Sequence, residues 1–322
     1  MAIGKASDFV IYHEEFFTGV SEVIEQNANA FNAASAGSII ITPERLIGDY
    51  DKESFVKLIG GLISRRDTTS VAAATDKAMT QGENVLVKIN RKIGPVANTL
   101  DSFRKIGKDA QEMSFVLGQQ TGQAMAQNYL DTVTNALVAA MTANTAIVHD
   151  GSAGTLTHTK LVEGMAKFGD ASSRIRAFVM HSKPYFDLVK QALSDKIFEV
   201  AGVTIYSGTV ATFNRPVIVT DSAPLLTAGT PDEYSILGLV EGAAVIKESE
   251  ERYITSDEVT GLENLVLRIQ GEYAFNLGLK GYTWDVTNGG ANPSDAAIGT
   301  GTNWDKTATD NKSTAGILIQ VQ

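Results

Sequence analysis

The residue types that most often carry chemistry are sparse in this chain. It has four histidines, His13, His149, His158 and His181, and it has no cysteine. Without cysteine there is no disulfide, no thiolate nucleophile and no cysteine ligand for a metal. His149 and His158 lie close together in the sequence, but their spacing matches no zinc pattern. We therefore interpret them as solvated loop histidines and expect no metal and no cofactor.

The remaining chemical motifs also point away from catalysis. His181 and Ser182 end a predicted strand, where a catalytic group could lie, yet no G-x-S-x-G pattern surrounds them. There is no G-x-x-x-x-G-K-[ST], and the "GTGT" at Gly299 lies in a polar loop. The acidic runs at 248–251 and 257–258 offer carboxylates, but such runs are usually solvated faces. The sequence therefore predicts a protein that is not an enzyme.

Composition narrows the class further. The chain has 322 residues, 43% of them hydrophobic, and a net charge of −10. This length suits two domains or one domain with excursions, with enough apolar residues for a core. A negative net charge disfavours tight binding to a nucleic acid backbone. No secretory signal and no membrane-spanning run of 18 or more apolar residues is present.

One long segment has almost no charge and needs elements on more than one side to cover it. From Phe115 to Val148 the only ionisable side chain besides a tyrosine is Asp131. A helical pattern that covers most of this segment extends over 108–143, which gives a helix of roughly 50 Å. Its periodic positions are small or apolar: Phe115, Gly118, Gly122, Met125, Tyr129, Val133, Leu137 and Met141. We expect one side to pack on a sheet of the same subunit and the other to lie against neighbouring subunits.

The segments before this helix predict an arm, a helix and a hairpin. Residues 1–40 alternate short apolar clusters with Asn, Ala and Ser, and 27–37 predict a polar, extended arm. A short strand, "SIIIT", is predicted next, and Thr42 with the following proline indicates a helix start. Apolar residues at three- and four-residue spacing predict a helix over 51–65. "ENVLVKIN" alternates as a strand, and Gly94-Pro95 would turn the chain back. Whether this hairpin lies at a sheet edge or projects from the body stays open.

The second half predicts an α/β block and then mostly strands. Between 151 and 229, helix patterns at 156–170 and 183–193 flank a strand at 175–182, which is a β-α-β alternation. From 234 the chain alternates as strands. Residues 287–314 predict a long loop with Trp304 as its lone aromatic residue, and "GILIQV" is a terminal strand.

This order of parts resembles the major capsid protein of tailed bacteriophages, with the Hong-Kong-ninety-seven-type fold. The strings "RLIGDYDKESFVKLIGGLISRRD", "VMHSKPYFDL", "LKGYTWD" and "GTNWDK" also look like phage coat proteins. The resemblance implies an α+β fold with an N-terminal arm, an extended β-hairpin loop, a long spine helix with a peripheral β-sheet, and an axial α/β domain. The implied parts are the arm 1–40, a helical segment 41–66, the extended loop 67–107, the spine helix 108–150, the axial domain 151–229 and the peripheral return 230–322.

The same resemblance implies a structural role. The subunit would self-assemble into hexamers and pentamers of an icosahedral or prolate phage head that encloses double-stranded DNA, without binding it sequence-specifically. Assembly would take place in the cytoplasm of the bacterial host and yield the virion capsid. Because the sequence begins almost directly with the arm, a separate scaffolding protein is expected, together with a portal and a possible decoration protein. No covalent crosslink between subunits is predicted.

The hairpin is the element expected to mediate assembly. Its candidate assembly residues are Val85, Val87, Ile89, Arg91, Lys92 and Phe103. Two other classes remain open. An encapsulin-like cargo shell would share the fold, and a soluble α/β enzyme would use 151–229 as its catalytic domain.

Overall fold

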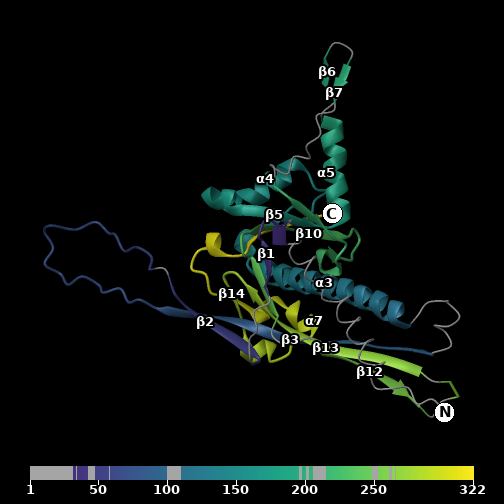
Figure 1. Ribbon diagram of the computed structural model, residues 1–322. Helices are drawn as coiled ribbons and strands as arrows, with labels where there is room; N and C mark the ends of the chain where they lie inside the picture. Colours follow the sequence, from purple (N-terminus) through teal and green to yellow (C-terminus); the bar gives the residue numbers. More distant parts are fainter. Residues whose placement is uncertain are drawn as a thin grey trace.

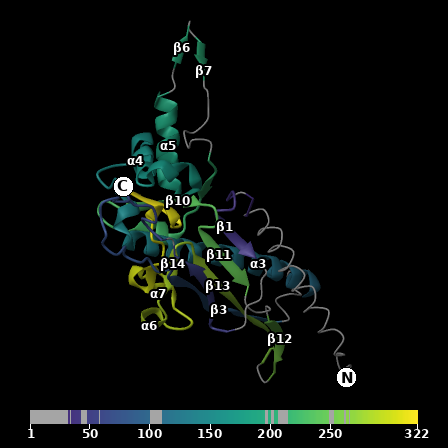
Figure 2. The same cartoon turned by 90° about the vertical axis from the view of Figure 1, so that its left-hand side faces the viewer.

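The computed structural model describes residues 32–33, 35–42, 48–57, 59–99, 110–195, 198–200, 203–205, 215–248, 253–260, 263–264 and 266–322. These residues form two main sheets and a small hairpin, with helices packed against the sheets (Figures 1 and 2). The predicted arm, the helix start after Thr42 and the candidate residue Phe103 lie largely or wholly outside these ranges.

The larger sheet has eight strands built around one long strand, β13. The main path runs in the order β1 (Ile39–Thr42), β11 (Ala244–Glu248), β13 (Val266–Leu279), β14 (Tyr282–Trp284) and β15 (Trp304–Lys306). β3 (Gln81–Thr99) and β12 (Tyr253–Val259) also pair with β13, and β2 (Tyr50–Val56) pairs with β3. The β1–β11 pair is parallel, and the pairs made by β13 are antiparallel.

The second sheet has six strands and contains the predicted β-α-β unit. Its strands are β4 (Val148–Asp150), β16 (Gly316–Val321), β10 (Glu233–Val240), β5 (Ile175–Met180) and β8 (Val217–Val219), with β9 (Leu226–Thr227) beside β10. β5 and β8 are parallel, and α5 (Ser182–Asp195) lies between them in the sequence. The hairpin of β6 (Phe198–Val200) and β7 (Val203–Ile205) follows α5 (Figure 1). The predicted strand and helix of this block are confirmed, as is the terminal strand.

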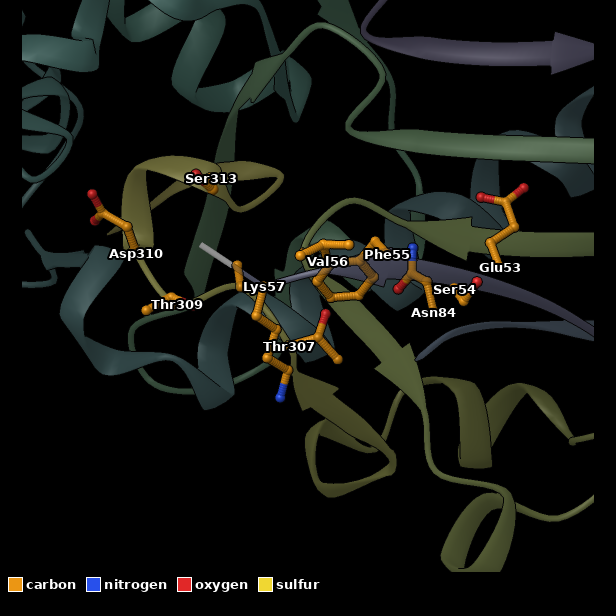
Figure 3. Close-up of a pocket in the computed structure, with 12 residues that line it drawn as sticks. Glu53, Ser54, Phe55, Val56, Lys57, Asn84, Thr307, Thr309, Asp310 and Ser313 are labelled. Carbon is orange, nitrogen blue, oxygen red and sulfur yellow. The ribbon is translucent and has the colours of Figure 1, made fainter. Parts of the chain in front are cut away.

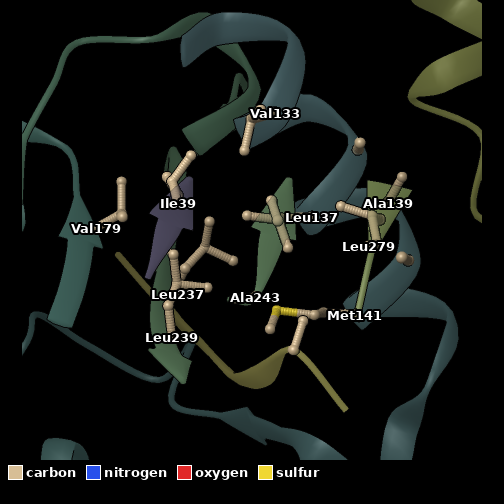
Figure 4. Packing of buried hydrophobic residues seen from close by; sticks show 14 of the residues in the cluster. Ile39, Val133, Leu137, Ala139, Met141, Val179, Leu237, Leu239, Ala243 and Leu279 are labelled. Atoms are coloured by element: carbon tan, nitrogen blue, oxygen red, sulfur yellow. The ribbon is translucent and has the colours of Figure 1, made fainter. Parts of the chain in front are cut away.

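The helix α3 (Ala110–Ala143) confirms the predicted long helix over its described part. Its largest buried side chains follow a spacing of four, so they share one face that packs on the sheets. The stripe consists of Met125, Tyr129, Val133, Leu137 and Met141. In Figure 4, Val133, Leu137 and Ala139 lie in the same apolar cluster as Ile39, Leu237 and Leu279 from strands of both sheets.

The other side of α3 is covered mainly by the subunit's own C-terminal segments. α7 (Asp295–Ile298) and the 3-10 helix η4 (Gly301–Asn303) pack on it, and Asn135 Nδ2 donates to the carbonyl of Asp295 at 2.8 Å. A Cβ on Gly301 would lie 2.7 Å from the Ala139 carbonyl oxygen, so only glycine permits this approach. Asp131, the one charged side chain of α3 after Glu112, accepts a hydrogen bond from Ser222 Oγ at 2.6 Å. The expectation that neighbouring subunits cover this face is therefore wrong for its C-terminal half, which the chain covers itself.

Short elements complete the fold. They are the helices α4 (His158–Ala166) and α6 (Val286–Gly289), and the 3-10 helices η1 (Thr145–Ile147), η2 (Gly169–Arg174), η3 (Ala223–Leu225) and η5 (Asn311–Ser313). The region 287–314 is thus not the structureless loop that its composition predicts. Trp304 packs edge-to-face on Trp284 with ring centroids 4.9 Å apart, and its Nε1 donates to the Ile298 carbonyl at 2.9 Å. This buried pair folds the segment back onto α3.

Two predictions before α3 are wrong. The residues predicted as a helix over 51–65 instead form β2 and the start of an irregular loop. Gly94-Pro95 does not turn the chain back, because β3 runs through it to Thr99. The register against β13 shifts there, which indicates a bulge, and Gly94 has φ of +73°. The bulge accommodates the proline inside a long strand.

Candidate assembly surface

The projecting hairpin consists of β2, residues 57–80 and the first part of β3. The two strands pair antiparallel from Tyr50 opposite Val87 to Val56 opposite Gln81. A hydrogen bond from the Lys57 N–H to the Thr80 carbonyl at 2.9 Å continues the ladder by one step. Beyond it the chain leaves the body as a long loop, the blue trace at the left of Figure 1. The open question from the sequence is answered in favour of projection, with the tip at 57–80 rather than at Arg91 and Lys92.

The loop is held in shape by its own short-range contacts. Every residue from 60 to 80 is exposed, and none of them lies in a helix or strand. Lys77 Nζ donates to the Gly60 carbonyl at 2.8 Å, which closes the loop near its base. Asp67 accepts from the Thr69 hydroxyl at 2.7 Å and from its backbone N–H at 2.9 Å, and these bonds hold the pKa of Asp67 below its usual value. Within the described ranges, no part of the body of the same subunit packs over these residues.

Four large apolar side chains on this loop face solvent. Ile63 is 96% exposed, Val71 104%, Met79 71% and Leu62 69%. Exposed apolar side chains gathered on one projecting element indicate an interaction surface, because burying them against a partner releases hydration water. The sequence pattern does not reveal this surface, because the spacing of Leu62 and Ile63 places them on the apolar face of a predicted helix. Gly60-Gly61, directly before them, was the signal against that helix.

Three predicted assembly residues lie inside the subunit. Val87 and Ile89 are fully buried and Val85 is nearly so, all within the main apolar core. They belong to the part of β3 that pairs with β13 or β2, so their alternation reflects the fold of one chain. The prediction that these three residues contact a neighbouring subunit is therefore wrong.

The two charged candidates have different surroundings. Arg91 donates to Thr132 Oγ1 on α3 at 3.3 Å and forms an ion pair with Asp295 at the start of α7. It ties β3, α3 and α7 together within one subunit. Lys92 is exposed opposite Glu272 on β13 and stays a candidate for contact with a partner. Phe103 lies outside the described residues.

His149 and His181 each contact a nearby carboxylate. His149 Nε2 lies 3.3 Å from Glu163 on α4. His181 Nε2 lies 3.4 Å from Asp221, which accepts the Ser182 N–H at 3.2 Å, so this carboxylate anchors the start of α5. Hydrogen bonds from Ser182 hold the pKa of Asp221 below its usual value. In the described ranges, no three His, Asp or Glu side chains gather as metal ligands. Among those ranges there is also no helix whose length and apolar content would let it cross a membrane.

A pocket of about 320 Å³ lies at the base of the hairpin, between β2 and the loop before η5 (Figure 3). Phe55, Val56 and Ala308 supply apolar lining, and Glu53 and Asp310 lie among its polar groups. The Phe55 ring lies over Gly82 on the paired strand, where a Cβ would come within 2.6 Å of Cζ. The pocket thus follows from the pairing of β2 with β3 and from the return of the C-terminal segment.

Solved phage structures share this fold. That of Microbacterium phage Oxtober96 superposes with a TM-score of 0.54 at 10% identity, covering 90% of this chain and 91% of that chain. The capsid asymmetric unit of cyanophage Pam1 gives 0.53 at 11% identity, with 88% of each chain covered. The capsid of Ralstonia phage GP4 gives 0.52 at 10% identity, covering 88% of this chain and 86% of that chain. The fold is therefore that of a phage capsid subunit.

The sequence itself gives the family. Residues 8–318 match the family described as major capsid protein 13-like, and the chain belongs to this family. It is a structural subunit of a homo-oligomeric capsid, as the sequence predicts, and its place is the virion. The matches do not favour an encapsulin-like cargo shell. A search of curated protein sequences finds no significant match.

Proposed function

We propose that the chain forms the hexamers and pentamers of an icosahedral or prolate phage head that encloses double-stranded DNA. Its role is structural rather than enzymatic. The observation that carries the proposal is the loop 59–80, which keeps large apolar side chains in solvent on a member of a capsid family. A subunit that works alone would have no reason to retain this surface.

The charge of the chain suits a container for DNA. A net charge of −10 gives no excess of lysine and arginine with which to replace the counterions of the DNA backbone. The wall would confine the genome through its shape and continuity, without reading or gripping it. Salt would then weaken the association of shell and DNA only slightly.

Different segments of the chain would make different contacts in the assembled capsid. The arm 1–40 and the hairpin would lie across neighbouring subunits, and the block 151–229 would lie near the centre of each capsomer. Partners would be a separate scaffolding protein, a portal and a decoration protein, with assembly in the host cytoplasm. These partners and this placement rest on the family resemblance.

Removing the loop tests the proposal. Residues 62–76 would be replaced by two glycines, because the Lys77 to Gly60 hydrogen bond brings the ends of this segment together. We expect wild-type circular dichroism and an unchanged melting temperature, since these residues bury no apolar surface in their own subunit. Shells should be absent in electron micrographs. Normal shells from this variant would show that the loop has no role in assembly.

A further inference from the structure

The pocket beside β2 and the exposed loop of the same chain have complementary properties. Val56 lines the pocket yet is 54% exposed, and Phe55 is only partly covered. A volume of about 320 Å³ lies at the lower end of the ~300–1,000 Å³ typical of binding pockets. This space suits one or two aliphatic side chains with some polar surroundings.

The loop carries two exposed aliphatic residues that are adjacent in the sequence. Leu62 and Ile63 follow directly on Gly60-Gly61, whose carbonyls Lys77 Nζ contacts. The clamp fixes the start of the loop, so these two side chains project from a defined point. Preorganisation of this kind lowers the entropy lost on binding.

Charge favours the same pairing. Arg65 and Arg66 lie just beyond the aliphatic pair and are exposed. The pocket lining carries two carboxylates, Glu53 and Asp310, and one ammonium, Lys57. Glu53 is already paired with Lys247 at 3.0 Å, so Asp310 is the acidic group that faces the arginines of an incoming loop. Opposite charges at a rim mainly set orientation and register.

We propose that the pocket formed by β2 and residues 307–313 receives Leu62 and Ile63 from the loop of a second copy of this chain. This inference rests on the proposed function and adds its receptor site. The loop extends away from the body while the pocket lies at its base, so the donor is a neighbouring subunit (Figures 1 and 3). Repeated around a ring, each subunit donates one loop and accepts another, which is a heterologous contact that closes.

Hydrogen exchange on the wild-type protein gives the first test. Backbone amides at 53–57 and 307–310 should exchange roughly ten-fold or more slowly in shells than in free subunits. Shells with unchanged exchange at both segments would overturn the pocket inference and leave the proposed function standing. If the wild type forms no shells under any condition, both the pocket inference and the proposed function are contradicted.

Cysteine pairs identify the occupant, because the chain has no cysteine of its own. Subunits carrying Ile63→Cys would be co-assembled with subunits carrying Ala308→Cys and then oxidised. We expect disulfide-linked dimers in shells and none in free subunits. Val71→Cys is the matched control, since Val71 is equally exposed on the same loop. Efficient linking through Val71→Cys without linking through Ile63→Cys would overturn the assignment, and so would protection of the pocket with no Ile63 link.

Discussion

Replacing Leu137 with aspartate should prevent the subunit from folding. Leu137 is fully buried in the C-terminal half of α3, in the apolar cluster that joins the helix to both sheets (Figure 4). Truncating such a leucine to alanine costs about 2–5 kcal/mol through lost burial and the cavity left behind. An aspartate there would also bring a carboxylate into a site without a partner, at a further cost of several kcal/mol.

Together, the lost burial and the unpaired carboxylate cost about as much as the whole free energy of unfolding of a domain, about 5–15 kcal/mol. Leu137→Ala should therefore remain folded with a lower urea midpoint, while Leu137→Asp should be found in the insoluble fraction or lack a cooperative transition. The matched control is Gln127→Asp, at an exposed position of the same helix, with an expected change within about 0.5 kcal/mol. A wild-type midpoint for Leu137→Asp would refute the placement of α3 against the sheets.

Three further predictions follow from the contacts of the hairpin and core. Asp295→Ala should lower the free energy of unfolding by about 1–2 kcal/mol, because it leaves the largely covered Arg91 guanidinium without its carboxylate. Burial raises the pKa of Tyr273 from 10.0 to about 12, so the folded chain keeps a proton that the unfolded chain releases. Stability should be fully present below pH 10 and fall by up to about 3 kcal/mol between pH 10 and 12 in urea titrations. Trypsin should cleave the free subunit first after Arg65 or Arg66 in the exposed loop, and this cleavage should disappear in shells.

Each of these three predictions has its own control. Lys52→Ala removes an exposed ion pair with Glu83 and should change stability by less than about 1 kcal/mol, so an equal effect of both variants would contradict the buried role of Arg91. Tyr273→Phe should flatten the alkaline loss of stability, and an unchanged slope would assign it to other groups. Resistance of the free subunit to trypsin at the loop would mean that the subunit covers these arginines itself.

The helices and strands whose apolar residues repeat at a regular spacing were predictable from the sequence. The stripe from Met125 to Met141 repeats every four residues over several turns, and nothing in the segment interrupts it. Val85, Val87 and Ile89 alternate clearly as a strand. In both cases the period of the apolar residues alone selects the element.

The wrong predictions concern residues whose structure depends on contacts with a segment distant in the sequence. Phe55 lies in a strand because β3 pairs with β2, and that partner is not visible from local spacing. Leu62 and Ile63 repeat like a helix face, but the subunit provides no core for them to join. Trp304 reads as a lone aromatic in a loop until Trp284, 20 residues earlier, packs against it. The hairpin itself was predictable, whereas the exposure of its individual residues was not, since buried and exposed apolar residues look alike in sequence.

Electron microscopy of the purified wild-type protein tests the central claim most directly. Across a range of concentrations and ionic strengths, alone and with a scaffolding protein, we predict closed shells whose wall fits repeated copies of this fold. In such a reconstruction the loop 59–80 should lie on a neighbouring subunit. A monomer under every condition, with the loop still exposed, would contradict the account.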